Sequence, residues 1–466
     1  MRLLVVALLF ASLLGLSSAT TYYLYPTNTT WPSTIQNLKA GDTAILSAGQ
    51  FTLNQKFGVT LSGTSGARIV VKGAGASETT ITQQADQNVM DVAGTYFSFY
   101  NMTFTGGSRG VRLFESSSDV LFENVNIHHT KDTAFSANDA GKTYTRLTLR
   151  GMEVHHSAEA GPEVATGECF YLGCQDNKCQ VTSSLVELNY CHDTTNAKPG
   201  WGSGIQLKTG SYDNIIRDNV IVNTLAPGIL LYDDYQKGTN LVEGNVVMTT
   251  DDNGIQVSSG VLVQNNIVIG AKAAGIAVSN NQLQTTGVYH DVKIIHNTVY
   301  SSGSADLYLP ILSKSEFVIA NNLFLTSAKA FDVKTQTGAV WRKNAYVGGT
   351  VPTGVDTAGV FQVTSGDVIN AGGNDFYPTE SSLLINAGSS SYSPRLTYDF
   401  NGKSRSATTP TVGAYEHSTA TNPGGAVKAG FKSGASSDSQ PPSGGGSNTP
   451  SGANTLTSWL APVLAL

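Results

Sequence analysis

Short stretches in which apolar and polar residues alternate recur through most of the chain, separated by glycine or asparagine. Glycine opens such a stretch at positions 204, 228, 254 and 275, at spacings of 24, 26 and 21 residues. A bend asparagine recurs at positions 219, 245, 266, 297, 322 and 344. Alternation with a period of two is typical of β-strands that bury one face. Because all these spacings lie between 21 and 31 residues, the pattern predicts a β-solenoid in which each repeat forms one coil.

The repeats divide into about twelve coils, and the segment before them is predicted to close the first coil. Ser33–Lys39 is expected to form a short helix there, because the open end of a solenoid exposes apolar side chains and free strand edges. Beyond the repeats, Ser381–Gly388 and Val412–Glu416 are predicted to form closing strands, and Asp399–Lys403 a turn. The predicted organisation in chain order is a signal peptide at 1–19, a solenoid domain at 20–417 with coils at 41–348 and a closing segment at 349–417, a linker at 418–455 and an apolar tail at 456–466.

The two ends of the chain carry patterns typical of export and attachment. Arg2 precedes the apolar run Leu3–Leu16 and the small residues Ser17–Ala19, which is the order of a secretory signal peptide; an uncleaved membrane anchor is the alternative. The linker is rich in Gly, Ser and Pro, and the apolar tail after it predicts a GPI-anchor signal. A plain secreted tail and a partner-binding end are the alternatives. We expect a secreted protein that is either free or held at the cell surface.

Composition agrees with stacked strands and narrows the range of partners. Charged residues make up only 13% of the chain, which contains 49 glycines, and this balance is a poor one for helices. The formal net charge of −6 provides no basic surface for nucleic acid. It also provides no general attraction for an acidic polymer, which would need a local cation.

The four cysteines lie close together in the sequence, at Cys169, Cys174, Cys179 and Cys191. In a secreted protein they are expected to form disulfides. Four cysteines allow three pairings, and the spacing does not choose among them. A zinc site is the alternative.

One coil, between His156 and Leu185, is enlarged and contains three of these cysteines. Long ordered loops are often functional, so we expect this one to be fastened over one side of the solenoid, beside the coil that holds Lys208. An insertion without a function is the alternative. Asn28 and Asn101 each begin a sequence that is glycosylated in secreted proteins.

Aligning the repeats predicts which side chains share the outer face of the solenoid. In the strand after Gly204, Ile205 and Leu207 are expected to point inward, and Gln206 and Lys208 outward. The outward residues of successive coils are Tyr171, Gln206, Lys208, Tyr232 and Gln256. An aromatic ring, a cation and amides on one face suit a sugar polymer. A surface lysine and outward packing residues are the alternatives.

Carboxylates follow the strand ends around this face, at Glu168, Asp233, Asp234, Asp251 and Asp252. Calcium takes six to eight oxygen ligands, so the cluster predicts a calcium site. Solvated turn residues are the alternative for the two Asp pairs.

Histidine pairs recur one coil apart, at His128–His129 and His155–His156, and His192–Asp193 stands at the equivalent place in the next coil. We expect the members of the His128, His155 and Asp193 column to stack. Such a column would serve as an acid–base group or a metal site. Stacked polar turn residues explain it equally well.

The glycine-led strands and asparagine bends, over about residues 40–350, resemble the right-handed parallel β-helix superfamily. The resemblance implies an all-β, single-stranded right-handed parallel β-helix with a short N-terminal helical cap. Within it, Leu207–Asn214 (LKTGSYDN) resembles the lysine-bearing strand of the alginate lyase and chondroitinase-B-like lyases, and of one calcium-dependent pectate lyase family. In those enzymes the lysine takes the proton beside a uronate carboxylate, which implies that Lys208 is the catalytic base.

Two features differ from the chondroitinase-B-like pattern. Tyr232 stands where that pattern has an arginine, and Trp201, Ser203 and Gln206 stand where it has glutamates. The polygalacturonase pattern is matched less well, because no Gly-His-Gly follows the Asp pairs.

The resemblance implies a monomeric polysaccharide lyase that cleaves an acidic, uronate-containing polysaccharide by β-elimination. Tyr232 would donate a proton or stack on a sugar, and Tyr171, Gln206 and Gln256 would contact the substrate. Calcium is the expected cofactor, with no organic cofactor. A non-catalytic surface protein that binds glycans or partners is the first alternative, and a glycoside hydrolase or uronan epimerase is the second.

Overall fold

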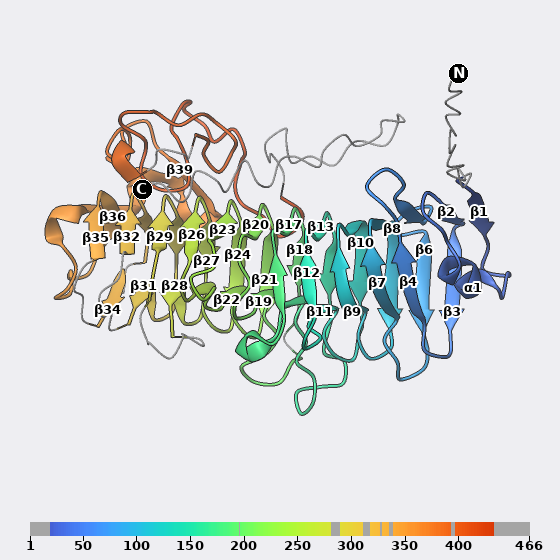
Figure 1. The fold of residues 1–466 in the computed structure, drawn as a ribbon. Coiled ribbons are helices and arrows are strands. Elements are labelled where there is room, and N and C mark those ends of the chain that lie inside the picture. Colours follow the sequence, from blue (N-terminus) through green and yellow to red (C-terminus); the bar gives the residue numbers. More distant parts are fainter. Residues whose placement is uncertain are drawn as a thin grey trace, which may run out of the picture.

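The computed structural model describes residues 19–194, 196–280, 289–310, 317–326, 329–334, 339–392 and 397–432. Parallel strands stack along one axis into a long right-handed β-helix (Figure 1). Nearly all of the predicted signal peptide, most of the predicted linker and the whole apolar tail lie outside the described residues. No helix of the described part has the length and apolar character to span a membrane.

The strands of the coils form three columns, in which each strand pairs in parallel with its equivalent in the next coil, and β38 and β39 of the closing segment form a separate antiparallel pair. Column 1 consists of β1 (Thr21–Leu24), β2 (Thr43–Leu46), β5 (Ile69–Lys72), β8 (Phe97–Gly106), β10 (Leu121–His128), β13 (Thr148–Arg150), β17 (Leu185–Glu187), β20 (Ile215–Arg217), β23 (Asn240–Glu243), β26 (Val261–Gln264), β29 (Val292–Ile295), β32 (Phe317–Ala320) and β35 (Ala339–Arg342).

Column 2 shares the long strands β8 and β10 with column 1, because these two strands run through both faces. Its other members are β3 (Gly49–Leu53), β6 (Thr79–Gln83), β14 (Glu153–His155), β18 (Tyr190–His192), β21 (Val220–Thr224), β24 (Val246–Thr250), β27 (Ile267–Ile269), β30 (Thr298–Tyr300), β33 (Leu323–Phe324), β36 (Asn344–Val347) and β37 (Val360–Val363).

Column 3 forms a separate sheet and carries the predicted outer face. It consists of β4 (Gly58–Ser62), β7 (Met90–Thr95), β9 (Val111–Ser118), β11 (Phe135–Ala137), β15 (Phe170–Leu172), β19 (Ile205–Leu207), β22 (Ile229–Leu231), β25 (Ile255–Val257), β28 (Ala274–Val278), β31 (Ala305–Leu309) and β34 (Phe331–Val333), with β12 (Thr143–Thr145) paired to β9 and β16 (Gln180–Thr182) paired to β12.

The core is a continuous stack of the inward side chains that the alternation predicts. Ile205 and Leu207 lie in it fully buried, as predicted. Phe99 and Phe122 from successive coils stack with ring centroids 5.2 Å apart. Burial of such a side chain contributes about 1.5–3 kcal/mol, so every coil adds its own share to the stability of the whole.

The predicted asparagine column is a buried ladder that crosses the coils. Asn219 donates its side-chain amide to Asn245 at 2.9 Å, Asn245 donates to Asn266 at 2.9 Å, and the ladder continues to Asn344. The left-handed turn conformation belongs to the preceding residue, such as Asp218 or Asn321, and the ladder asparagine satisfies the buried backbone of the bend.

The N-terminal cap is present as α1 (Trp31–Gln36), slightly earlier than predicted. Pro32 stands in its first turn, where proline costs no hydrogen bond. Trp31 packs edge-on against Phe51 and Phe57, with ring centroids 5.4 Å apart in both pairs. The helix therefore covers the apolar end of the first coil.

The closing segment differs from its prediction, because neither Ser381–Gly388 nor Val412–Glu416 forms a strand. The chain instead folds back along the outside of column 2, where Figure 1 shows it in orange and red. Leu384, Val412 and Tyr415 cover outward apolar residues of that column. The elements of this segment are β38 (Val368–Asn370), β39 (Asp375–Pro378), η2 (Thr357–Gly359), η3 (Ser365–Asp367), η4 (Ala371–Gly373) and η5 (Ser390–Tyr392). The turn predicted at Asp399–Lys403 is present, closed by a 2.7 Å hydrogen bond from Asp399 N to Lys403 O.

Residues 418–432, the first part of the predicted linker, also lie against the β-helix. Val427 is buried, and its N–H donates to Asn374 O at 3.0 Å. The Lys432 ammonium binds Asp218 at 2.5 Å and lies 4.1 Å from the centre of the Phe400 ring. The chain is thus attached well past the predicted end of the domain.

Candidate functional site

Lys208 lies directly after β19 on the outer face of column 3, within a group of aromatic rings. Its Nζ donates to the Tyr232 hydroxyl at 3.0 Å. The ring centres of Tyr232, Tyr171 and Trp201 lie 4.2, 4.9 and 5.8 Å from Nζ. The side chain points outward as predicted, yet the residue is only 2% exposed, so it is not a solvated surface lysine.

Main-chain pairing holds this arrangement in place. Lys208 N donates to Leu172 O at 2.7 Å, and Tyr232 N donates to Leu207 O at 3.0 Å. The strand register pairs Tyr171 with Gln206 and Gln206 with Leu230. The strand register therefore confirms the order of outward residues that the repeats predict.

Burial lowers the pKa of Lys208 to about 8, and the carboxyl group of Glu168 opposes that shift. Glu168 is itself fully buried, and burial raises its pKa. Thr133 donates a 2.9 Å hydrogen bond to its Oε2. Burial thus disfavours the charged form of both groups, because each lies in a poorly solvated region.

Several buried polar atoms along this face have no hydrogen-bond partner among the described residues: Glu168 Oε1, Gln206 Oε1, Ser136 Oγ and Ser258 Oγ. Ser136 pairs with Tyr171 in the strand register, so it extends the same row. Buried polar atoms are nearly always satisfied in proteins. A water molecule, or a ligand that carries hydroxyl groups, would satisfy these four atoms. Gln256 differs, because its amide is already bonded to Asn253 and Ser279.

The predicted metal-binding carboxylates separate into different environments. Asp233 and Asp234 are buried and meet His290, whose Nε2 lies 2.5 Å from Asp234 Oδ1 and 4.0 Å from Asp233 Oδ1. Burial opposes protonation of His290, but the hydrogen bond and charge of Asp234 raise its pKa. Asp251 is exposed and pairs with Lys272 at 3.6 Å.

These carboxylates do not form one calcium site among the described residues. Asp252 accepts from Asn253 N at 2.7 Å, and Glu168 faces Thr133. The Asp233 and Asp234 carboxylates already accept from the main-chain N–H groups of Tyr235 and Gly238. Two carboxylates leave most of the six to eight oxygens of a calcium shell unsupplied. Of the predicted carboxylates, Asp233 and Asp234 lie close enough, with His290, to share a metal ion. Calcium binding stays a prediction.

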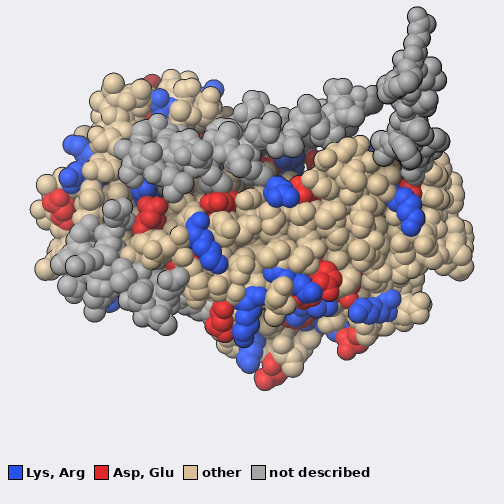
Figure 2. Space-filling view, viewed as in Figure 1, with Lys and Arg blue, Asp and Glu red and all other residues tan. Residues whose placement is uncertain are grey.

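Charges of both signs are mixed on the surface around this region. In Figure 2, Lys and Arg lie beside Asp and Glu along the lower edge of the view. The outward Arg112 pairs with Asp139 at 2.7 Å, and Arg109 pairs with Asp132 at 3.3 Å. Recognition of an acidic polymer would therefore depend on individual cationic side chains near the site, as the net charge indicated.

The sequence prediction missed Trp201, Ser136 and His290 as members of this region. Trp201 lies in an irregular loop, so no repeat register indicated its contact with Lys208. His290 is 56 residues from Asp234, more than one coil away. Ser136 carried a signal, because it occupies the same repeat position as Tyr171.

The cysteines form the pairs Cys169–Cys191 and Cys174–Cys179. The first pair lies inside the core and joins the start of β15 to β18, and the second closes the turn that contains η1 (Gln175–Asn177). Neither pair includes a residue of the part of the enlarged coil at 157–167. A small apolar cluster holds the loop instead: Ala158, Ala165 and Ala197, packed against Trp201 and Leu225.

The two glycosylation candidates differ in setting. Asn28 lies in the turn before α1, and its side-chain oxygen accepts from Thr30 N at 2.9 Å. Asn101 lies within β8, and its side-chain oxygen accepts from Asn124 at 2.8 Å. Their glycosylation stays a prediction.

The predicted histidine stack is present at the end of column 2 with one correction: His192, not Asp193, continues the column of His128 and His155, and Asp193 stands in the register of His156. His128 stacks on His155 with ring centroids 5.0 Å apart, and His155 stacks on His192 at 4.7 Å. His156 stacks on His129 at 5.1 Å, and Asp193 follows next to His192. Burial and the neighbouring imidazoles lower the pKa of His155 to about 3. The column lies on a different face from Lys208.

Comparison with known proteins agrees with this architecture. The family model described as "Periplasmic copper-binding protein (NosD)" matches residues 170–354. No curated protein matches the sequence. Among solved structures, pectate lyase Pel9A is similar with a TM-score of 0.55 and 17% identity, over 87% of this chain and 98% of that one.

The A-module of the mannuronan C-5 epimerase AlgE6 of Azotobacter vinelandii is similar with a TM-score of 0.52 and 14% identity, over 71% of this chain and 95% of that one. At such identities the likeness concerns the fold. The stacked parallel strands and these neighbours show that the chain has the right-handed parallel β-helix fold.

Proposed function

We propose that the protein is an extracytoplasmic polysaccharide lyase that cleaves a uronate-containing polysaccharide by β-elimination, with Lys208 as the base and Tyr232 as the proton donor. One observation carries the proposal. The Lys208 amine, whose pKa burial lowers to about 8, lies 3.0 Å from the Tyr232 hydroxyl on the outer face of the β-helix. The signal-peptide pattern and the two disulfides support the location.

The two groups are suited to the two proton transfers of β-elimination. Neutral Lys208 would take the proton from the carbon beside the uronate carboxylate. The electron pair left behind forms a carbon–carbon double bond, and the bond to the oxygen of the next sugar breaks. Tyr232 gives its proton to that leaving oxygen. The 3.0 Å hydrogen bond then lets the Lys208 ammonium return a proton to the Tyr232 phenolate, so both residues regain their starting forms.

The surroundings support an acidic sugar as the substrate. Burial disfavours the charged form of Glu168, which weakens its repulsion of a uronate carboxylate. The unpartnered atoms of Gln206, Ser136 and Ser258 would bond sugar hydroxyls. Tyr171 and Trp201 offer ring faces, on which sugars stack.

Non-catalytic glycan binding is a second candidate, favoured by one specific observation. Lys208 is only 2% exposed, so a substrate reaches its amine only if Trp201 or another covering side chain moves. A binding protein would need no such movement, because its ligand would contact the outer rings alone.

The assay that separates the two uses the full secreted chain. The protein is incubated with pectate, alginate, glucuronan and chondroitin, each with calcium and with a chelator, and the absorbance of the unsaturated product is followed. We expect product from at least one polymer, and the chelator arm tests the calcium prediction. Absence of product from all four, together with retention of one of them on the protein, would identify a binding module.

Matched variants assign the residues. Lys208→Ala and Tyr232→Phe are each expected to lower the rate by about 10²–10⁴-fold, with an unchanged circular dichroism spectrum. Lys272→Ala, which removes a lysine that is 71% exposed, serves as the control and is expected to keep full activity. An active Lys208→Ala protein would remove Lys208 from the role of base.

A further inference from the structure

The end of column 2 carries a group of histidines that the proposed lyase chemistry does not use. His155 and His156 are adjacent, and their Nδ1 atoms lie 2.7 Å apart. The pair one coil earlier, His128 and His129, repeats the arrangement at 2.8 Å. One ring nitrogen from each of His155, His156 and His192 falls within a group whose atoms all lie within 4.8 Å of one another.

The spacing of each adjacent pair fits two ligands of one metal ion. Imidazole nitrogens bind zinc at about 2.0–2.1 Å, so two such ligands at a right angle are about 2.9 Å apart. Copper(II) favours right angles of this kind. A hydrogen bond between the two rings would produce the same separation, and the experiment below distinguishes the two cases.

The turn itself does not require histidine at these positions. His129 and His156 adopt left-handed backbone angles, with φ of 52° and 47°. The equivalent residues of the next two coils are Asp193 and Asn223, which adopt the same conformation with φ of 57° each. Short polar residues therefore satisfy the turn, and the paired imidazoles need another explanation.

Carboxylates surround the histidines as they do in metal centres. His192 Nδ1 lies 2.7 Å from Asp193 Oδ2, and its Nε2 lies 3.4 Å from Glu153 Oε1. His129 Nε2 lies 3.8 Å from Glu159 Oε1. On His129 the carboxylate contacts one ring nitrogen, which orients the ring and makes the other nitrogen a better ligand. His192 has a carboxylate on each nitrogen, so a metal ion would replace one of these contacts.

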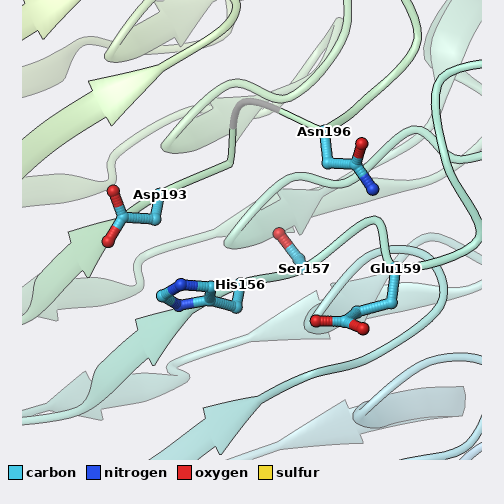
Figure 3. Close-up of a pocket in the computed structure, with 5 residues that line it drawn as sticks. All are labelled: His156, Ser157, Glu159, Asp193 and Asn196. Carbon is cyan, nitrogen blue, oxygen red and sulfur yellow. The ribbon is translucent and has the colours of Figure 1, made fainter.

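A half-open cavity of about 250 Å³ lies beside the column and provides access. His156, Ser157, Glu159, Asp193 and Asn196 line it. Figure 3 shows His156 and Asp193, from successive turns, next to each other on one side of this cavity, with Glu159 and Asn196 on the other side. An ion can therefore reach His156 from solvent, and Asp193 and Glu159 offer it oxygen ligands.

We propose that His155, His156 and His192 bind a divalent transition metal ion of the copper or zinc class at this cavity, and that the pair His128 and His129 extends the site by one coil. The site is separate from the Lys208 face. Four of its five histidines also precede the residues that match the NosD family model.

The test uses the full secreted chain without a histidine tag. Binding of Cu²⁺ and of Zn²⁺ is measured by calorimetry, with Ca²⁺ and Mg²⁺ as ions that imidazole disfavours. We expect micromolar or tighter binding of Cu²⁺ or Zn²⁺ only. The electron paramagnetic resonance spectrum of the copper form is expected to show coupling to at least two nitrogens. Equal binding of all four ions, or a copper spectrum without nitrogen coupling, would overturn the proposal.

Neighbouring coils supply variants that keep the turn. His155→Thr with His156→Asn places residues like Thr105 and Asn223, which stand at the equivalent positions of other coils. His192→Val places the residue of the next coil, Val222. Each variant is expected to weaken metal binding at least 10-fold and to retain lyase activity. His417→Asn, in the closing segment, is the control and should bind as the parent does.

Folding is checked for each variant by circular dichroism. If the double variant misfolds, His192→Val and the copper spectrum of the parent still decide the question. Unchanged affinity in a folded variant would assign the rings to mutual stacking and hydrogen bonding alone.

Discussion

At the scale of single residues, the candidate site depends on how little water reaches Lys208. The residue belongs to an outward position, yet Tyr171, Trp201 and Tyr232 surround its amine. Desolvation disfavours the ammonium form, while the faces of the three rings favour it. The pKa of about 8 reflects a burial effect that exceeds the remaining charge of Glu168.

The lyase rate should therefore depend on pH through Lys208. A base acts in its neutral form, so kcat/KM is expected to rise as pH increases and to level off above about pH 8. Below that pH the rate should fall about tenfold per pH unit, because the amine is protonated. A kcat/KM profile measured from pH 5 to about 10 checks this. A profile that is already flat between pH 6 and about 7 would contradict the role of this amine.

At the scale of elements, each coil is held to the next by strand pairing and by the asparagine ladder. Asn245 shows what one ladder residue does. Its Oδ1 accepts from the N–H and the amide of Asn219 at 3.0 and 2.9 Å, and its Nδ2 donates to Ile216 O at 2.9 Å. All these groups are buried, so none is satisfied by solvent.

Asn245→Ala should accordingly destabilise the fold far more than a surface change does. Each buried group left without a partner costs about 1–3 kcal/mol, and we expect a total loss of about 3–5 kcal/mol in the free energy of unfolding. Denaturant unfolding provides the measurement. Asn126→Ala, at a half-buried position of β10, is the control. Similar losses in both variants would show that the ladder adds nothing specific.

The two disulfides should contribute unequally. Cys169–Cys191 closes a separation of 22 residues inside the core, whereas Cys174–Cys179 closes only 5. Loop-closure entropy alone favours the longer bridge, about 3 kcal/mol against about 2 kcal/mol. Replacing each pair by serines and comparing melting temperatures tests the order. A larger loss from the Cys174–Cys179 replacement would contradict it.

At the scale of the whole molecule, the closing segment turns an open solenoid face into a second core. Arg405 joins the two, because its buried guanidinium donates to Asn265 Oδ1 and to the carbonyls of Gly413 and Ala414, at 2.8, 3.0 and 2.8 Å. Glu416 balances its charge at 3.5 Å. The segment thereby covers outward apolar residues of column 2.

Arg405→Ala is expected to loosen that segment at a cost of about 3–5 kcal/mol, because Glu416 is left without its cation. Thermal unfolding should shift to lower temperature, and binding of an apolar dye should report the exposed face of column 2. Arg342→Ala, which breaks a half-exposed ion pair of 3.6 Å, should change stability by less than about 1 kcal/mol. Equal effects of the two changes would mean that the closing segment is held by apolar contacts alone.

The sequence by itself determined the β-helix and the order of residues along its outer face. The alternation in Gly204–Lys208 assigns inward and outward positions, and one repeat per coil places Tyr171, Gln206 and Leu230 in register. The first property follows from the alternation of residues within a strand, and the second from the spacing of the repeats. Both can be read from the sequence. The stacking of His128 on His155 was predictable for the same reason.

Only the tertiary structure decided the contacts made by irregular segments. No sequence repeat predicts these contacts. They are the approach of Trp201 to Lys208, the contact of His290 with Asp234, the pairing of the cysteines and the return of the closing segment along column 2. They depend on the conformations of turns of unequal length and on what each packs against. The burial that lowers the pKa of Lys208 arises from those contacts. The sequence therefore indicated the residue but not its lowered pKa.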